Sequence, residues 1–190
     1  MTKNSGGSAP RPPAVPKVQF EHPTQLAATT FLQAVASNEA ATIWECLSRE
    51  TRGLLEGHYA GRAAVALHRA AGVAPSGEDA RLAEVVAPLR DSIVGALGGA
   101  EKLGGFGVSG ARVVDRATAY VLLLPEFGEE RIVTEVDWKP SHLLAFVHES
   151  REWFVDLGRT ADLSVDAGLP DPLGAIKSSG GSALDPPGSA

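Results

Sequence analysis

Cysteine is nearly absent from this sequence, since Cys46 is the only one among 190 residues. A single thiol excludes an internal disulfide and a zinc site built from several cysteines. Cys46 lies at helical spacing beside Ile43 and Leu47, so we interpret it as a small core residue rather than as a reactive thiol.

Positive charge is also scarce. The chain has 17 Lys and Arg against 23 Asp and Glu, which gives a formal net charge of −6. This sign opposes binding to a phosphate backbone, so we do not expect nucleic acid as a partner. The sequence shows no N-terminal apolar segment of the signal-peptide type and no run of the ~20 apolar residues that a membrane span needs. We therefore expect a cytoplasmic protein that has no membrane partner.

Nucleotide-binding motifs are missing or out of context. No Gly-Lys-Ser or Gly-Lys-Thr sequence occurs, which excludes a phosphate-binding loop of that type. Gly105-x-Gly107-x-x-Gly110 has the spacing of a dinucleotide fingerprint, but that motif requires a strand before it and a helix after it. Here a predicted helix precedes the glycines and a predicted strand follows them. We interpret the glycine-rich insertion at about 95–110 as a flexible connection, and we expect no cofactor.

Between two low-complexity ends, the sequence predicts a single domain. Residues 1–22 and most of 158–190 are rich in Gly, Ser, Pro and Ala, and we predict that both segments are disordered tails. The domain, at 23–157, begins with amphipathic helices. The first begins at Pro23 with Thr24 as its expected N-cap, Ser48 caps a later helix, and Pro88 should kink or divide the last one.

Four runs rich in β-branched and aromatic residues follow the helices, at 117–124, 131–138, 143–149 and 153–157. Their short polar breaks predict a four-stranded antiparallel meander, and helices before such a sheet indicate an α+β fold. The expected loops place Trp138 opposite Leu143, Glu149 opposite Glu152, and Leu124 opposite Arg131. One predicted face, which we expect the helices to cover, then carries Ala119, Val121, Leu123, Val136, Trp138, Leu143, Ala145, Val147 and Phe154. The other carries Tyr120, Leu122, Glu135, Asp137, Leu144, Phe146, His148, Trp153 and Val155.

The paired short helices around Phe31, Trp44 and Leu47, followed by a meander that ends in Glu-Trp-Phe-Val-Asp-Leu, resemble the nuclear transport factor 2-like and SnoaL-like superfamily. The resemblance implies a cone-shaped α+β domain in which N-terminal helices pack on a curved antiparallel meander. It also implies frequent dimerisation and a helix-lined pocket, and members include enzymes, ligand binders and interaction modules. The pocket residues that we expect are Phe31, Trp44, Val136, Trp138 and Val147.

The second face carries the candidates for chemistry. If the protein is an enzyme, a SnoaL-like hydrolase, isomerase or cyclase, Glu135 or Asp137 would act with His148 and Tyr120 as a carboxylate-histidine base arrangement. One histidine with two carboxylates is a weak set for a transition metal, so we expect no metal.

We favour a non-catalytic module that binds a protein partner or a small apolar ligand. In this interpretation Tyr120, Phe146, His148 and Trp153 form the interface of a homodimer, because helices can cover only one face of the sheet. The alternative is that residues 77–110 or 158–176 cover that face within one chain.

Overall fold

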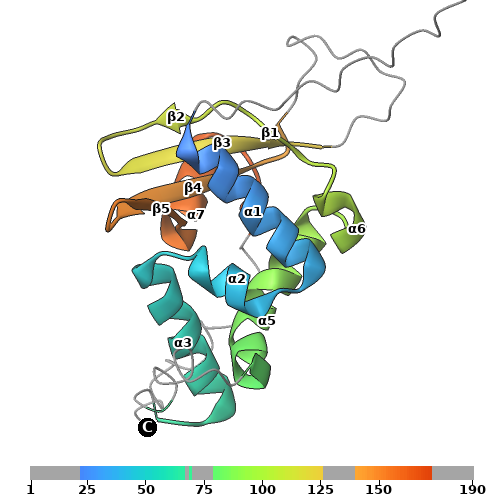
Figure 1. The fold of residues 1–190 in the computed structure, drawn as a ribbon, viewed down its shortest axis with the longest axis vertical. Coiled ribbons are helices and arrows are strands. Elements are labelled where there is room, and N and C mark those ends of the chain that lie inside the picture. The colour runs from blue at the N-terminus through green and yellow to red at the C-terminus, as the bar shows by residue number, and fades with distance from the viewer. Residues whose placement is uncertain (1–21, 67–68, 70–78, 126–139, 173–190) are drawn as a thin grey trace, which may run out of the picture.

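The computed structural model describes residues 22–66, 69, 79–125 and 140–172. The predicted α+β class is confirmed, because helices pack on a curved antiparallel sheet (Figure 1). Of the predicted tails at 1–22 and 158–190, residues 1–21 and 173–190 lie outside the described residues, and so does the predicted strand at 131–138. No helix in the described part combines the length and the apolar character that crossing a membrane requires.

Helices form both before and after the sheet. They are α1 (Pro23–Ser37), α2 (Ala40–Glu45), α3 (Arg49–Ala63), α5 (Asp79–Ala96), α6 (Ala100–Leu103) and α7 (Leu157–Asp166). The N-cap of α1 is His22 rather than Thr24, because the His22 side chain accepts the Thr24 N–H while the Gln25 side chain accepts the His22 N–H. These two bonds make a capping box, and Pro23 occupies the first helical position, where its missing N–H costs nothing.

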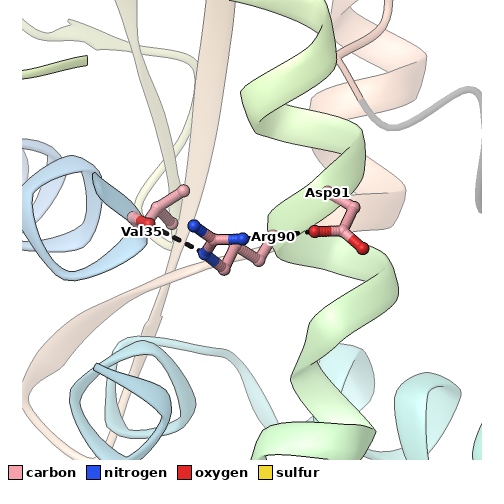
Figure 2. A network of polar contacts seen from close by, with 3 residues as sticks. All are labelled: Val35, Arg90 and Asp91. Atoms are coloured by element: carbon pink, nitrogen blue, oxygen red, sulfur yellow. Dashed lines mark hydrogen bonds and ion pairs between the residues drawn. The ribbon is translucent and has the colours of Figure 1, made fainter. Parts of the chain in front are cut away.

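The C-terminus of α1 is tied to α5. Arg90 Nε donates to the Val35 carbonyl at 3.3 Å, and the same guanidinium lies 3.3 Å from the Asp91 carboxylate (Figure 2). A cation at a helix C-terminus favours the negative end of the dipole, and the bond from Arg90 adds to the one that the Val35 carbonyl accepts from the Asn38 N–H. Helix α5 is not divided at Pro88, contrary to one expectation, and its residues run from Asp79 to Ala96.

The strand order differs from the predicted meander. The strands are β1 (Gly107–Val108), β2 (Arg112–Val113), β3 (Thr118–Leu124), β4 (His142–Glu149) and β5 (Glu152–Val155), in the order β1-β3-β4-β5, with β2 also paired to β3. Strands β3 and β4 are direct neighbours, with Ala119 opposite Phe146. The prediction that residues 131–138 separate them is therefore wrong. The β4–β5 hairpin is confirmed, with Glu149 opposite Glu152.

Because β3 and β4 pair directly, the side chains that share a face differ from those predicted. Phe146 pairs with Ala119 and Val155, so it points to the same side as Val121 and Leu123, not to the opposite side as predicted. This side packs on the helices. The core cluster brings together Phe31, Val35, Ile43, Trp44, Leu47 and Leu89 from the helices with Val121, Leu123, Leu144, Phe146 and Val155 from the sheet.

The domain does not end at residue 157. Helix α7 packs against β4, and Thr160 and Ala161 are buried there. Thr160 Oγ1 accepts the Ala145 N–H at 3.0 Å, and the Asp156 N–H donates to the Ala145 carbonyl. The predicted boundary is therefore wrong, because residues 157–166 fold as a helix on the sheet. This outcome agrees in part with the alternative that 158–176 packs within one chain.

Candidate functional site

The described members of the predicted pocket, Phe31, Trp44 and Val147, do not line a common cavity. Phe31 is 0% exposed and Trp44 is buried, and both belong to the packed core. Val147 lies on the opposite side of the sheet, because it pairs with Thr118 and Phe154. Val136 and Trp138 lie outside the described residues. The cavities described below are lined by other side chains.

The candidate catalytic residues are also not assembled in the described part of the chain. Tyr120 pairs with Ala145, whereas His148 is on the side of Phe146, so the two side chains point to opposite faces. His148 is exposed, and its ring lies 5.0 Å from the ring of Trp153. Glu135 and Asp137 lie outside the described residues.

The four predicted interface residues do not form one surface. Phe146 is fully buried in the core of a single chain, and Tyr120 lies on the other face of the sheet. Trp153 is half-buried, with the His22 ring at 5.2 Å and the His148 ring at 5.0 Å. Phe146 is therefore wrong as an interface residue, because the helices cover it. The homodimer itself stays a prediction.

The candidate site is a cavity of about 390 Å³ at one end of the sheet, which we call the His142 cavity. Its size falls in the range of about 300 to 1,000 Å³ that small-molecule sites occupy. Among its lining residues Leu97 and His142 are buried, Phe106 and Ser141 are half-buried, and the others are exposed. The lining consists of Ala96, Leu97, Gly98, Lys102, Phe106, Pro125, Ser141 and His142.

A turn of two glycines shapes one side of the His142 cavity. Gly98 and Gly99 join α5 to α6 with φ values of 84° and 124°, which side chains disfavour. A Cβ atom on Gly98 would lie 3.5 Å from Nζ of Lys102, so the Lys102 side chain extends back over the turn. Lys102 is exposed, and it adds one ammonium to the lining.

His142 supplies a polar group without a partner. The residue is 8% exposed, and its Nδ1 has no hydrogen-bond partner among the described residues. Burial lowers the pKa of the imidazole below its ordinary value, because the protonated form loses hydration. At neutral pH the ring is therefore neutral, with one N–H to donate and one nitrogen lone pair to accept. A buried polar atom that lacks a partner costs about 1 to 3 kcal/mol, and Nδ1 has less than 1 Å² of accessible surface.

Sequence reasoning missed the His142 cavity for two reasons. The Lys-Pro-Ser-His segment reads as a loop, whereas His142 is the first residue of β4. The sequence did contain a signal for a buried His142, because side chains alternate along a strand and His142 is on the same side of β4 as buried Leu144 and Phe146. Lys102 and Phe106 were overlooked because the glycine-rich insertion was interpreted as a flexible connection. In the structure it contains α6 and the paired strand β1, which corrects that interpretation.

Two other hollows offer less to a ligand. One of about 450 Å³ is lined by Asn38, Glu39, Ala40, Ala41, Thr42 and Ala83, most of which are exposed or half-buried. The other, of about 180 Å³, includes Arg52 and Glu149. Arg52 already donates to the carbonyls of Trp44 and Glu45, and Glu149 accepts the Arg49 N–H at the start of α3. Arg52, one of the two cations in this lining, is thus already bonded within the chain.

Cys46 behaves as the interpretation from sequence expects. The residue is half-buried and packs against the core cluster. Burial first, and then the neighbouring Glu45 carboxylate, raises the pKa of the thiol to about 11, although Arg52 opposes the shift. The thiol is therefore protonated at neutral pH, which does not suit a nucleophile.

Within the described ranges, no group of three or more His, Cys, Asp or Glu side chains could hold a metal ion. The geometry thus brings together one cavity, one unpartnered imidazole and one ammonium.

In the comparisons with known proteins, the chain matches no protein-family model, no curated protein and no solved structure.

Proposed function

We propose that this protein is a non-catalytic module that binds a small, mainly apolar molecule in the His142 cavity. The observation that carries the proposal is a cavity of about 390 Å³ whose lining combines apolar side chains with a buried imidazole and one ammonium. Apolar walls with a few convergent polar groups are the usual composition of a ligand site. The proposal is consistent with the resemblance to the nuclear transport factor 2-like superfamily, which includes ligand binders.

The alternative, a SnoaL-like hydrolase, isomerase or cyclase, has less support. Tyr120 and His148 point to opposite faces of the sheet, so they would not act on the same molecule. In the His142 cavity, the described lining has an imidazole and an ammonium but no carboxylate to orient the ring. Binding is the simpler use of this arrangement.

The proposal can be tested with the neutral fluorescent probe N-phenyl-1-naphthylamine. We expect saturable binding at one site per chain. Ala96→Phe should weaken it at least about tenfold, because the new ring would fill the mouth of the His142 cavity. Ala63→Phe is the matched control, since Ala63 is also an exposed last residue of a helix and lies outside this lining.

Equal loss of probe binding in the two variants would contradict the proposal. Binding that neither substitution changes would also place the probe elsewhere and contradict it. Circular dichroism of both variants should match that of the unmodified protein, because both alanines are exposed.

A further inference from the structure

We propose that the molecule bound in the His142 cavity is a compact apolar compound that ends in a carboxylate. Its carboxylate lies between the Lys102 ammonium and the His142 imidazole, and its apolar body packs on Leu97 and Phe106. This inference rests on the proposed binding function and specifies the chemical class of the ligand.

The charge of the lining favours an anion. Lys102 is the only formally charged residue among those that line the cavity in the described part of the chain. The nearby Glu101 carboxylate lies over Gly99 and is not part of the lining. A cationic ligand would therefore meet a like charge, whereas a carboxylate would gain a charge-assisted hydrogen bond with the ammonium.

His142 favours a polar end group over a purely apolar ligand. An apolar molecule would offer no acceptor for the N–H of the neutral imidazole in the lining. A carboxylate accepts the N–H of a neutral imidazole, and the depressed pKa keeps the ring neutral near pH 7. Hydrogen bonds to a carboxylate are about twice as strong as those between neutral groups, so the acid is favoured over its amide.

The rest of the cavity suits an apolar body. Leu97 is buried and Phe106 is half-buried, and Ala96 and Pro125 add apolar surface at the mouth. Ser141 adds little to recognition, because its hydroxyl already donates to the Leu123 carbonyl at 3.4 Å. The polar groups are thus concentrated at Lys102 and His142, as recognition of one end group requires.

Three probes of nearly equal shape test this inference on the full chain. They are 1-naphthylacetate, 1-naphthylacetamide and 1-naphthylmethylamine, which carry a carboxylate, a neutral amide and a cation. Isothermal titration calorimetry gives the affinities, and amide chemical-shift changes locate the binding site. We expect the carboxylate to bind at least about tenfold more tightly than the amide, with shift changes at residues 96–106 and 141–142.

Two variants assign the preference to individual groups. Lys102→Met should reduce the affinity for the carboxylate toward that for the amide and should leave amide affinity unchanged. Arg116→Met, which removes another exposed cation outside the lining, should change neither affinity. His142→Phe should weaken both probes, and long-range proton–nitrogen spectra of the unmodified protein should show the ring nitrogens shifting only when a probe binds.

The outcomes separate the two proposals. If acid and amide bind equally at the His142 cavity, the carboxylate inference is overturned while the binding function stands. Tightest binding by the amine would also overturn the inference. If none of the three probes binds, or if the shift changes lie elsewhere, both proposals fall.

Discussion

Two helices begin at one buried pair of side chains. Ser48 caps α3 by accepting the Thr51 N–H at 3.1 Å, and Asp156 caps α7 by accepting the Arg159 N–H at 2.8 Å. The two caps bind each other, since Ser48 Oγ donates to Asp156 Oδ2 at 2.7 Å. Both residues are buried, so a carboxylate without water obtains its hydrogen bonds from a hydroxyl and a helix N-terminus. This pair joins segments that are far apart in sequence.

The Ser48–Asp156 pair gives a prediction for Ser48→Ala. The change should lower the free energy of unfolding by about 2 to 4 kcal/mol, because it removes an N-cap, worth about 1 kcal/mol, and leaves Asp156 Oδ2 without its donor. Urea denaturation measures the loss. Ser37→Ala, at an exposed serine of α1, should change the value by less than about 0.5 kcal/mol. A similar small change in Ser48→Ala would show that the pair contributes little.

At the scale of elements, α7 packs against the strand β4, which is longer than its partner β5. Strand β4 has 8 residues and β5 has 4, so β5 pairs with only part of β4. Residues 142–145 of β4 extend beyond β5, and α7 packs against β4, where the Thr160 hydroxyl accepts the Ala145 N–H. An exposed strand edge is a site of unwanted association between chains. Helix α7 thus protects the edge next to the His142 cavity.

Replacing Thr160 with Val keeps the shape of the side chain and removes the acceptor for the Ala145 N–H. Because both groups are buried, we expect the free energy of unfolding to fall by about 1 to 3 kcal/mol. Faster deuterium exchange at the Ala145 amide should accompany the loss. Thr30→Val is the control, since Thr30 is also helical but only half-buried. Unchanged exchange at Ala145 would contradict this account of the strand edge.

Sequence patterns predicted the positions of helices and strands better than they predicted which strands pair. The period near 3.6 around Phe31 and Leu55 gave α1 and α3, and the short break after Glu149 gave the β4–β5 hairpin, because these signals are local. The pairing of β3 with β4 is not local, and loop lengths do not reveal it. Helix α7 was missed because its few apolar residues, such as Leu157 and Ala161, lie in a segment of polar composition.

At the scale of the whole molecule, two buried polar groups differ in their hydrogen bonding. Asp156 is bonded by the hydroxyl and amide groups around it, whereas His142 lines a cavity with Nδ1 unpartnered. Native proteins pair nearly all buried polar atoms, so an exception calls for an explanation. The cavity could not be predicted from sequence, because the end of α5, α6 and the start of β4 meet only in the folded chain (Figure 1).

The state of His142 can be read from stability as a function of pH. Burial places its folded-state pKa below the unfolded value of about 6.5, so between these two values the unfolded chain binds more protons than the folded chain. The contribution of His142 is therefore complete above about pH 6.5 and is lost as the pH falls through that value toward the folded-state pKa.

We expect the free energy of unfolding of the unmodified protein, minus that of His142→Phe, to be constant from pH 8 to about 6.5 and to decrease at lower pH. Urea denaturation at steps of half a pH unit measures this difference. Taking the difference cancels the contributions of the other four histidines, and Lys102, the other ionisable group in the described lining, is present in both proteins. A difference that stays constant down to pH 5, or that increases in acid, would contradict this expectation. The folded chain would then bind a proton on His142 at least as readily as the unfolded chain, and His142 would not be the neutral imidazole on which carboxylate recognition depends.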